Sequence, residues 1–143
     1  MSTEVHLARD EAEVAAALKL REDVFCGEQG VPLEADLDGL DDGALQVVAI
    51  ENGELVGTCR VVLDGTTARF GRLCVRRDAR GRGLARALLD EAEVQARAAG
   101  AERMTLHAQT NALGLYRRAG YESEGEPFDE EGIEHLGMSR SLR

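Results

Sequence analysis

The feature that most constrains this chain is a glycine-rich turn, Arg80-Gly81-Arg82-Gly83-Leu84-Ala85. It lies between a run typical of a β-strand, residues 68–75, and a long run typical of a helix, residues 84–99. Such a turn leaves backbone N–H groups unsatisfied at the start of the helix, where the helix dipole also places partial positive charge. Two arginines inside the turn add full charges. We therefore predict that the turn binds the pyrophosphate of a nucleotide-bearing cofactor.

Composition limits the class of protein. The 143 residues are enough for one domain with one core, and 43% hydrophobic with 31% charged residues is a globular profile. A formal net charge of −10 disfavours partners such as nucleic acid or anionic membrane. Without a secretory signal or a run long enough to span a membrane, we expect a cytoplasmic protein with a single domain over residues 1–143. Three widely spaced cysteines predict free thiols and no metal site.

Hydrophobic periodicity and turn residues predict a mixed α/β domain. The turns Asn52-Gly53 and Asp64-Gly65 join three strands into an antiparallel meander. A helix then crosses to the next strand, so that pair of strands should be parallel. The expected elements, in order, are a strand at 4–8, a helix from Asp10 to Phe25, an acidic loop at 27–43, strands at 45–51, 55–63 and 68–75, a helix at 84–99, a strand at 104–108, a helix at 111–119, and two strands from Tyr121 and at 134–142.

The long helix at 84–99 has a clear apolar face. We expect Leu84, Leu88, Ala92 and Ala99 to be buried. On the same basis the charged residues Glu91, Glu93 and Arg97 should remain in solvent.

Residues beside the glycines distinguish three kinds of phosphate-binding loop. A Walker A loop requires lysine and a hydroxyl residue, and neither occurs from Arg76 to Leu89. A dinucleotide-binding loop requires a third small residue where this chain has Arg86, and it does not follow three antiparallel strands. The remaining pattern, Arg/Gln-x-x-Gly-x-Gly/Ala, is matched by Arg80, Gly83 and Ala85. At these residues the chain resembles the GNAT acyltransferase superfamily.

Further segments strengthen the resemblance and extend it over nearly the whole chain. Residues 115–121 look like the second GNAT signature, and residues 24–32, 106–109 and 128–135 resemble the ElaA/YjcF-like branch, with Glu134 in place of its usual proline. The resemblance implies an α/β fold with a mixed, mostly antiparallel sheet. One central parallel pair is splayed at the cofactor site, and helices flank both faces.

The resemblance also implies a reaction, the direct transfer of an acetyl group from acetyl-CoA to a primary amine of a small-molecule or peptide acceptor. Cys74 and Val75 would pair through their backbone with the pantetheine arm. The turn from Arg80 to Ala85 would bind the pyrophosphate, and Gln109 would contact the cofactor. Tyr116 would be the general acid that protonates the departing thiolate, although a tyrosine at this position can also simply pack under the sheet.

Other roles stay open. Strand residues 70–75 contain no acid to act as general base, which leaves Glu28 and His107 as candidates; the first can equally cap a helix and the second can be a histidine near the core. The acidic segment has two interpretations, a solvated loop or a substrate rim that attracts cationic amines. As an alternative to an enzyme, the domain can be a catalytically weak module that binds or senses CoA. A homodimer is also compatible with the resemblance. If the acidic segment is a substrate rim, the residues that bind the amine would be Glu34, Asp36 and Asp38.

Overall fold

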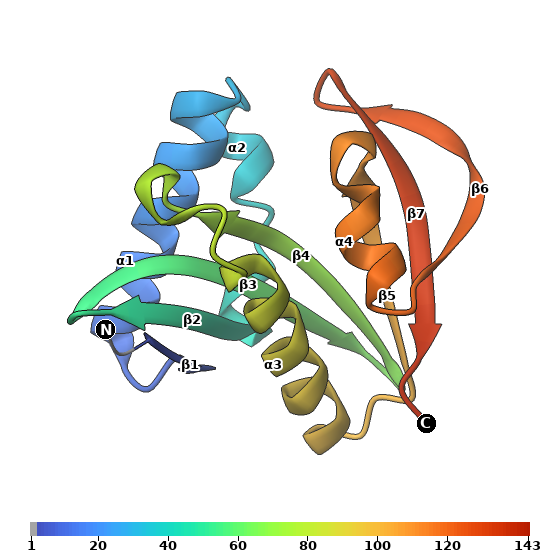
Figure 1. Cartoon of the computed structure of the whole chain (residues 1–143), viewed down its shortest axis with the longest axis horizontal. Coiled ribbons are helices and arrows are strands. Elements are labelled where there is room, and N and C mark those ends of the chain that lie inside the picture. Colours follow the sequence, from blue (N-terminus) through green and yellow to red (C-terminus); the bar gives the residue numbers. More distant parts are fainter. Residues whose placement is uncertain (1–2) are drawn as a thin grey trace.

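The computed structural model describes residues 3–143 as a seven-stranded mixed sheet with helices on both faces (Figure 1). The strand order is β1-β2-β3-β4-β5-β7-β6; β4 and β5 are parallel, and the other neighbours are antiparallel. This confirms the predicted fold class. The strands are β1 (Thr3–Leu7), β2 (Leu45–Glu51), β3 (Glu54–Asp64), β4 (Thr67–Val75), β5 (Arg103–Gln109), β6 (Glu122–Glu130) and β7 (Ile133–Ser141), and the helices are α1 (Glu11–Arg21), α2 (Leu33–Asp36), α3 (Leu84–Ala98) and α4 (Leu113–Arg118).

The meander β2–β3–β4 forms because its two turns are built from residues that accept left-handed backbone conformations. Asn52 and Gly53 have φ angles of 53° and 80°, and Gly65 has a φ of 61°. Two consecutive positive φ angles match the right-handed twist of the flanking strands. Both hairpins therefore lie where the sequence predicts them.

Helix α1 begins as predicted and ends later. The Asp10 carboxylate accepts the Glu13 N–H at 2.9 Å, which caps the helix. Beyond Arg21 the chain does not stop near Phe25 but continues as a π-helix, Glu22–Glu28. This extension brings Glu28 within hydrogen-bond distance of Arg80, and π-helical turns are frequent at functional sites.

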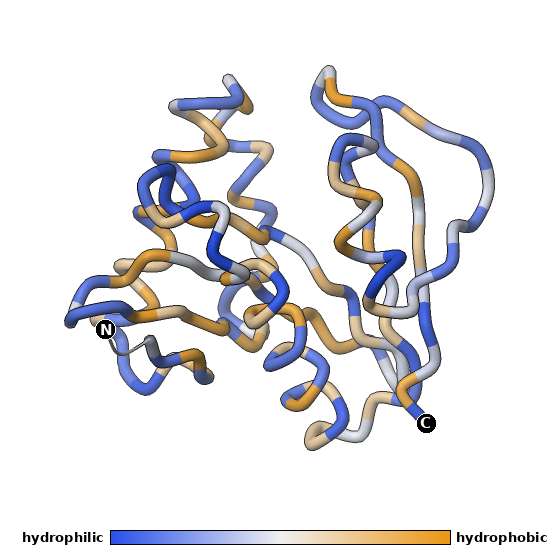
Figure 2. Tube along the Cα trace, in the orientation of Figure 1, coloured by the Kyte–Doolittle hydropathy of each residue, from blue (hydrophilic) through white to orange (hydrophobic). Residues whose placement is uncertain are grey.

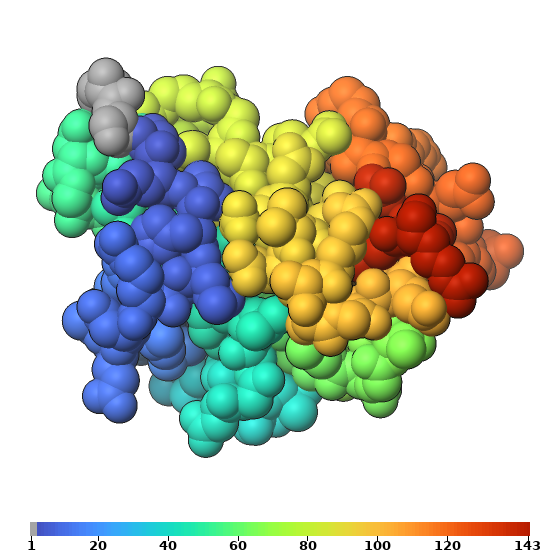
Figure 3. Space-filling view, turned by 90° about the horizontal axis from the view of Figure 1, so that it is seen from below, coloured from blue at the N-terminus to red at the C-terminus, as the bar shows by residue number. Residues whose placement is uncertain are grey.

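The main core lies between the sheet and α3. Leu88 and Leu89 are fully buried there, and Figure 2 shows the hydrophobic residues gathered on the central strands and on the inner side of α3. Seen from below, α3 lies between the N-terminal segments and the C-terminal strands (Figure 3). Two predictions for this helix were wrong: Ala99 is exposed, and Glu93 is only 6% exposed because its carboxylate accepts a hydrogen bond from the Tyr121 hydroxyl at 2.8 Å.

Helix α1 covers the opposite face of the sheet. Leu20 and Val24 pack there against Cys74 in a second, smaller cluster. None of the helices within residues 3–143 combines the length and the apolar character needed to cross a membrane.

Candidate active site

The parallel pair β4–β5 separates part-way along its length. Residues 67–70 of β4 pair with 103–106 of β5, and beyond this register the two strands run on without pairing with each other. In Figure 1 the two strands meet near the C-terminus and diverge toward the top of the view. A pocket of about 870 Å³ lies between them. The predicted splay of the central pair is therefore confirmed.

Arg72 marks the point where β4 bends away. It has a left-handed φ of 55°, and the pairing of β3 with β4 shifts register between Thr58 and Arg60. A non-glycine residue in this conformation costs on the order of 1–2 kcal/mol. Hydrogen bonds from the Arg72 guanidinium to the Asp36 carbonyl at 3.3 Å and to the Asp38 carboxylate at 3.1 Å offset that cost. The bend leaves one edge of residues 71–75 without a β5 partner, so an extended ligand can add to it as a strand.

The glycine turn closes one end of the pocket. Gly81 and Gly83 have φ angles of 79° and 83°, which other residues rarely adopt. Gly83 immediately precedes α3, and none of the side chains in residues 3–143 caps that helix with a hydrogen bond. The first N–H groups of α3 are therefore available to an anionic ligand.

Arg80 and Glu28 pair with each other in this structure. Arg80 donates through Nε to the Val75 carbonyl at 2.8 Å and through a terminal nitrogen to both Glu28 oxygens at 3.1 Å. Arg77 lies 3.9 Å from the same carboxylate. Arg80, which was predicted to bind phosphate, and Glu28, one of the two predicted general bases, thus form an ion pair with each other in this structure.

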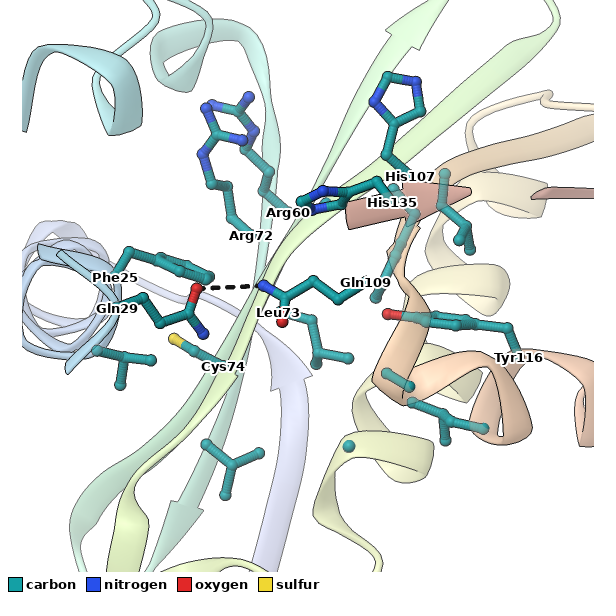
Figure 4. A pocket seen from close by; sticks show the side chains of 18 of the residues that line it. Phe25, Gln29, Arg60, Arg72, Leu73, Cys74, His107, Gln109, Tyr116 and His135 are labelled. Atoms are coloured by element: carbon teal, nitrogen blue, oxygen red, sulfur yellow. Dashed lines mark hydrogen bonds between the residues drawn. The ribbon is translucent and has the colours of Figure 1, made fainter. Parts of the chain in front are cut away.

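Tyr116 lies on α4 with its hydroxyl directed into the pocket (Figure 4). Its ring meets Phe70 edge-on with centroids 6.3 Å apart, and it is 6% exposed. Burial, with a smaller contribution from the Cys59 thiol, raises the pKa of the Tyr116 phenol well above its ordinary value. Within residues 3–143 no hydrogen bond engages this hydroxyl, so it is available to a ligand.

Two glutamine side chains bridge the gap between the diverging strands. Gln109, at the end of β5, donates from Nε2 to the Gln29 Oε1 at 3.1 Å (Figure 4). Gln29 follows the π-helix, so this contact connects the two walls of the pocket. From the sequence, Gln109 is predicted to contact the cofactor, whereas Gln29 is assigned no role.

His107 belongs to a cluster that sequence reasoning only half identified. Its side chain is 60% exposed, and its Nδ1 lies 3.1 Å from Glu130 on β6. The same carboxylate faces His135 on β7, and all three residues line the pocket. Strand register is the signal that brings them together, because His135 lies directly opposite Gln109 on β5 and Phe128 on β6.

Two residues of the acidic segment that were candidates for a substrate rim, Asp36 and Asp38, are bound by arginines of this chain. Asp36 is 3% exposed and forms ion pairs with Arg21 and Arg72, while Asp38 is bound by Arg60 and Arg72. These carboxylates tie the segment to the sheet and leave little charge for a substrate.

Glu34 is exposed and does not line the pocket between the strands. Its side chain therefore does not contribute to that pocket, in contrast to the substrate-binding role that the sequence suggested.

Cys74 lies in the pocket wall as an uncharged thiol. It is buried, and that burial raises the pKa of the thiol to about 12. Because the thiolate is the nucleophilic form, Cys74 acts here as a small apolar side chain. Cys26, Cys59 and Cys74 are all free.

Comparison with known proteins places these features in context. Residues 7–142 match the acetyltransferase (GNAT) domain. The chain is 32% identical to YjcF of Bacillus subtilis, an uncharacterized N-acetyltransferase, over 136 residues that cover 94% of this chain and 96% of YjcF.

Two solved structures share the fold. Escherichia coli ElaA superimposes with a TM-score of 0.84 at 24% identity, covering 97% of this chain and 98% of ElaA. YncA of Salmonella typhimurium, determined with its cofactor acetyl-CoA, has a TM-score of 0.79 at 20% identity, covering 100% of this chain and 95% of YncA. The resemblance read from the sequence is thus confirmed by sequence similarity to YjcF and by the shared fold.

Proposed function

Because this chain belongs to the GNAT family of N-acetyltransferases, we propose that it binds acetyl-CoA in the pocket between β4 and β5 and transfers the acetyl group directly to a primary amine. The observation that carries the proposal is the arrangement of this pocket. It has an unpaired strand edge along one wall, an uncapped helix start at one end and a phenol hydroxyl directed into it.

The cofactor positions follow from these three features. Cys74 and Val75 lie on the unpaired edge of β4, where their backbone would pair with the pantetheine arm. The N–H groups from Arg80 to Ala85 would hold the pyrophosphate. The pyrophosphate would compete with Glu28 for the Arg80 guanidinium, and its greater negative charge favours the exchange.

The transfer itself needs a proton donor for the leaving thiolate, and we assign this role to Tyr116. Its raised pKa keeps the phenol protonated across the physiological range, so the donor form is always present. A thiolate that leaves in the same dry pocket becomes more basic for the same reason, because desolvation disfavours both anions. Gln109, which extends from the end of β5 into the same pocket, would orient the cofactor.

The general base is proposed among the residues of the acceptor side. Glu28 pairs with Arg80 beside the glycine turn and is not among the described residues that line the pocket. His107 is exposed and lines the pocket. Of these two candidates, His107 is therefore the one placed to take part in removing the proton from the acceptor.

Partners and location complete the proposal. The acceptor is a small-molecule or peptide amine, and the protein works in the cytoplasm without a metal. Recognition of a cationic acceptor by Asp36 and Asp38 is not retained, because arginines of this chain neutralise both. A homodimer is compatible with the exposed edge strand β6.

A calorimetric titration with acetyl-CoA tests the first step. The unmodified protein should bind, and Arg80→Glu should weaken the affinity about tenfold or more, since a charge-assisted contact contributes about 1.5–3 kcal/mol. Lys19→Glu makes the same charge change on the outer surface of α1 and should leave the affinity unchanged. Absence of binding to the unmodified protein would refute the proposal.

A second candidate function is a module that binds or senses CoA without turnover. The observation in its favour is that residues 70–75 of β4 carry no carboxylate to serve as a base. A thiol-release assay with a panel of primary amines separates the two functions. An enzyme releases CoA faster when an acceptor is present, whereas a sensor binds acetyl-CoA and releases none.

A further inference from the structure

His107, Glu130 and His135 form a three-membered cluster at the pocket wall. One Glu130 oxygen lies 3.1 Å from His107 Nδ1, and the other lies 3.5 Å from His135 Nε2. The Phe128 ring contacts both imidazoles, with centroids 5.0 Å from His107 and 6.1 Å from His135. One carboxylate thus bridges two imidazoles whose orientations are fixed by an aromatic ring.

Hydrogen-bond geometry determines where the His135 protons lie. His135 Nδ1 is 2.7 Å from the Ile133 carbonyl oxygen, and a carbonyl only accepts, so Nδ1 carries a hydrogen. In the neutral ring Nε2 then has a lone pair, and it faces a Glu130 oxygen that also only accepts. A proton on Nε2 converts two facing acceptors into a charge-assisted contact. In the neutral ring the atom of His135 that can accept a proton is therefore Nε2.

The cluster also provides a way out for that proton. The His135 side chain is 9% exposed, whereas that of His107 is 60% exposed. Glu130 lies between them and contacts both rings. A proton that arrives at the inner histidine can thus be relayed through the carboxylate to the outer histidine and to solvent.

Other polar and charged groups lie around His135. Gln109, its neighbour on β5, is neutral, and Glu131 follows Glu130 in the turn between β6 and β7. Across the pocket lie Arg60 and Arg72 (Figure 4), and Asp38 pairs with both. Both guanidinium groups are paired with carboxylates, and Glu130 is the carboxylate in direct contact with His135.

We propose that His135 is the general base of the acetyl transfer and that Glu130 is a positioning residue that relays the proton to His107. This inference rests on the proposed function. The acceptor R–NH₃⁺ gives one proton to His135 Nε2 and attacks the thioester carbon as R–NH₂; the C–N bond forms and the C–S bond breaks. Tyr116 protonates the thiolate and recovers a proton from the attacking nitrogen, so that one proton in total leaves through Glu130 and His107.

Two amines that differ in charge test the base directly. Ethylamine is protonated at neutral pH and needs a base, whereas hydroxylamine is uncharged and does not. We expect His135→Gln to lower kcat/KM for ethylamine roughly 10²-fold or more, the usual contribution of a general base, and to lower it much less for hydroxylamine. Acetyl-CoA affinity, measured by calorimetry, should stay unchanged.

Glu130→Gln should also slow the acetylation of ethylamine more than that of hydroxylamine, but by a smaller factor than His135→Gln. The decrease should appear in kcat, and KM should stay unchanged. Its matched control is Glu126→Gln, which removes the same charge from an exposed position on the same strand and should have no effect. Equal losses for both amines in His135→Gln would overturn the inference and leave the proposed function intact. Unmodified protein that binds acetyl-CoA but acetylates no amine would overturn the proposed function and this inference with it.

A second readout needs no turnover. The chain has three histidines, so an imidazole ¹⁵N spectrum can be assigned with single His→Gln variants. We expect the Nδ1–H tautomer for neutral His135, and the opposite tautomer would overturn the inference whatever the kinetics show.

Discussion

At the scale of single residues, two neighbouring tyrosines show how the surroundings of a hydroxyl decide its role. Tyr116 and Tyr121 contact each other edge-on with ring centroids 6.1 Å apart, and both are buried. The Tyr121 hydroxyl donates to Glu93, whereas that of Tyr116 is directed into the pocket. A family motif marks Tyr116 in the sequence. The partner of Tyr121 could not be predicted, because Glu93 looks like a solvent-exposed residue until the turn after α4, which carries Tyr121, is placed beside α3.

Replacing each tyrosine by phenylalanine should separate catalysis from stability. Tyr116→Phe removes the proposed proton donor, so kcat should fall roughly 10²-fold with little change in acetyl-CoA affinity. Tyr121→Phe leaves the buried Glu93 carboxylate short of one donor, which should lower the free energy of unfolding by about 1–3 kcal/mol and spare kcat. Steady-state kinetics measure kcat for both variants, and urea denaturation measures their free energy of unfolding. An unchanged kcat in Tyr116→Phe would exclude it as the acid.

At the scale of structural elements, the sequence pattern locates most helices and strands but misses features set by distant contacts. The hairpins follow from Asn52-Gly53 and Gly65, whose preferences are local. The bend at Arg72 is different, since its guanidinium is held by the segment that carries Asp38, far away in the chain. Likewise, the π-helical continuation of α1 ends at Glu28, whose partner Arg80 lies far away in the chain and cannot be read from a local pattern.

The acidic segment should make stability depend on pH. A hydrogen bond from Arg60 is the main cause that lowers the pKa of Asp38 below its ordinary value. A carboxyl with a lowered folded-state pKa stabilises the fold fully above the unfolded-state value of about 3.9 and loses that contribution as pH falls further. Urea denaturation should therefore show a cost of Asp38→Asn that is full above about pH 5 and shrinks in more acidic solution.

Asp42→Asn is the matched control for this pH dependence. Asp42 is exposed and forms no ion pair within the described part of the chain. Its replacement should change the free energy of unfolding little at any pH. A constant effect of Asp38→Asn from neutral to acidic pH would contradict the assigned role of the Arg60–Asp38 pair.

The glycine turn can be probed through its backbone. Gly83 has a φ of 83°, and alanine in this conformation costs about 1–2 kcal/mol, so Gly83→Ala should destabilise the fold by that amount and also weaken acetyl-CoA binding. Gly53→Ala has a comparable cost at a φ of 80° in the hairpin between β2 and β3. Calorimetry should show normal affinity for Gly53→Ala. Equal affinities in the two variants would argue against phosphate binding at the turn.

At the scale of the whole molecule, the sheet consists of two arms that share a short parallel junction. Strands β1 to β4 form one arm and β5 to β7 the other, and the pairing between them spans only 67–70 and 103–106. The hairpins and the helical crossover predict the meander β2–β3–β4 and the parallel pair β4–β5 from the sequence, but not the position of β7 between β5 and β6. The place where the strands part does not follow from periodicity, because it depends on the bend at Arg72.

Acetyl-CoA should therefore tie the two arms together, and hydrogen exchange can detect this. A ligand that pairs with β4 and reaches Gln109 should slow amide exchange at residues 71–75 and also around 107–109. Inorganic pyrophosphate is the matched probe, since it can occupy the turn at 80–85 but cannot reach β5. It should protect the turn alone. Protection confined to the turn with acetyl-CoA as well would mean that the pantetheine arm does not enter the split, and the direct transfer proposed for this pocket would have to be abandoned.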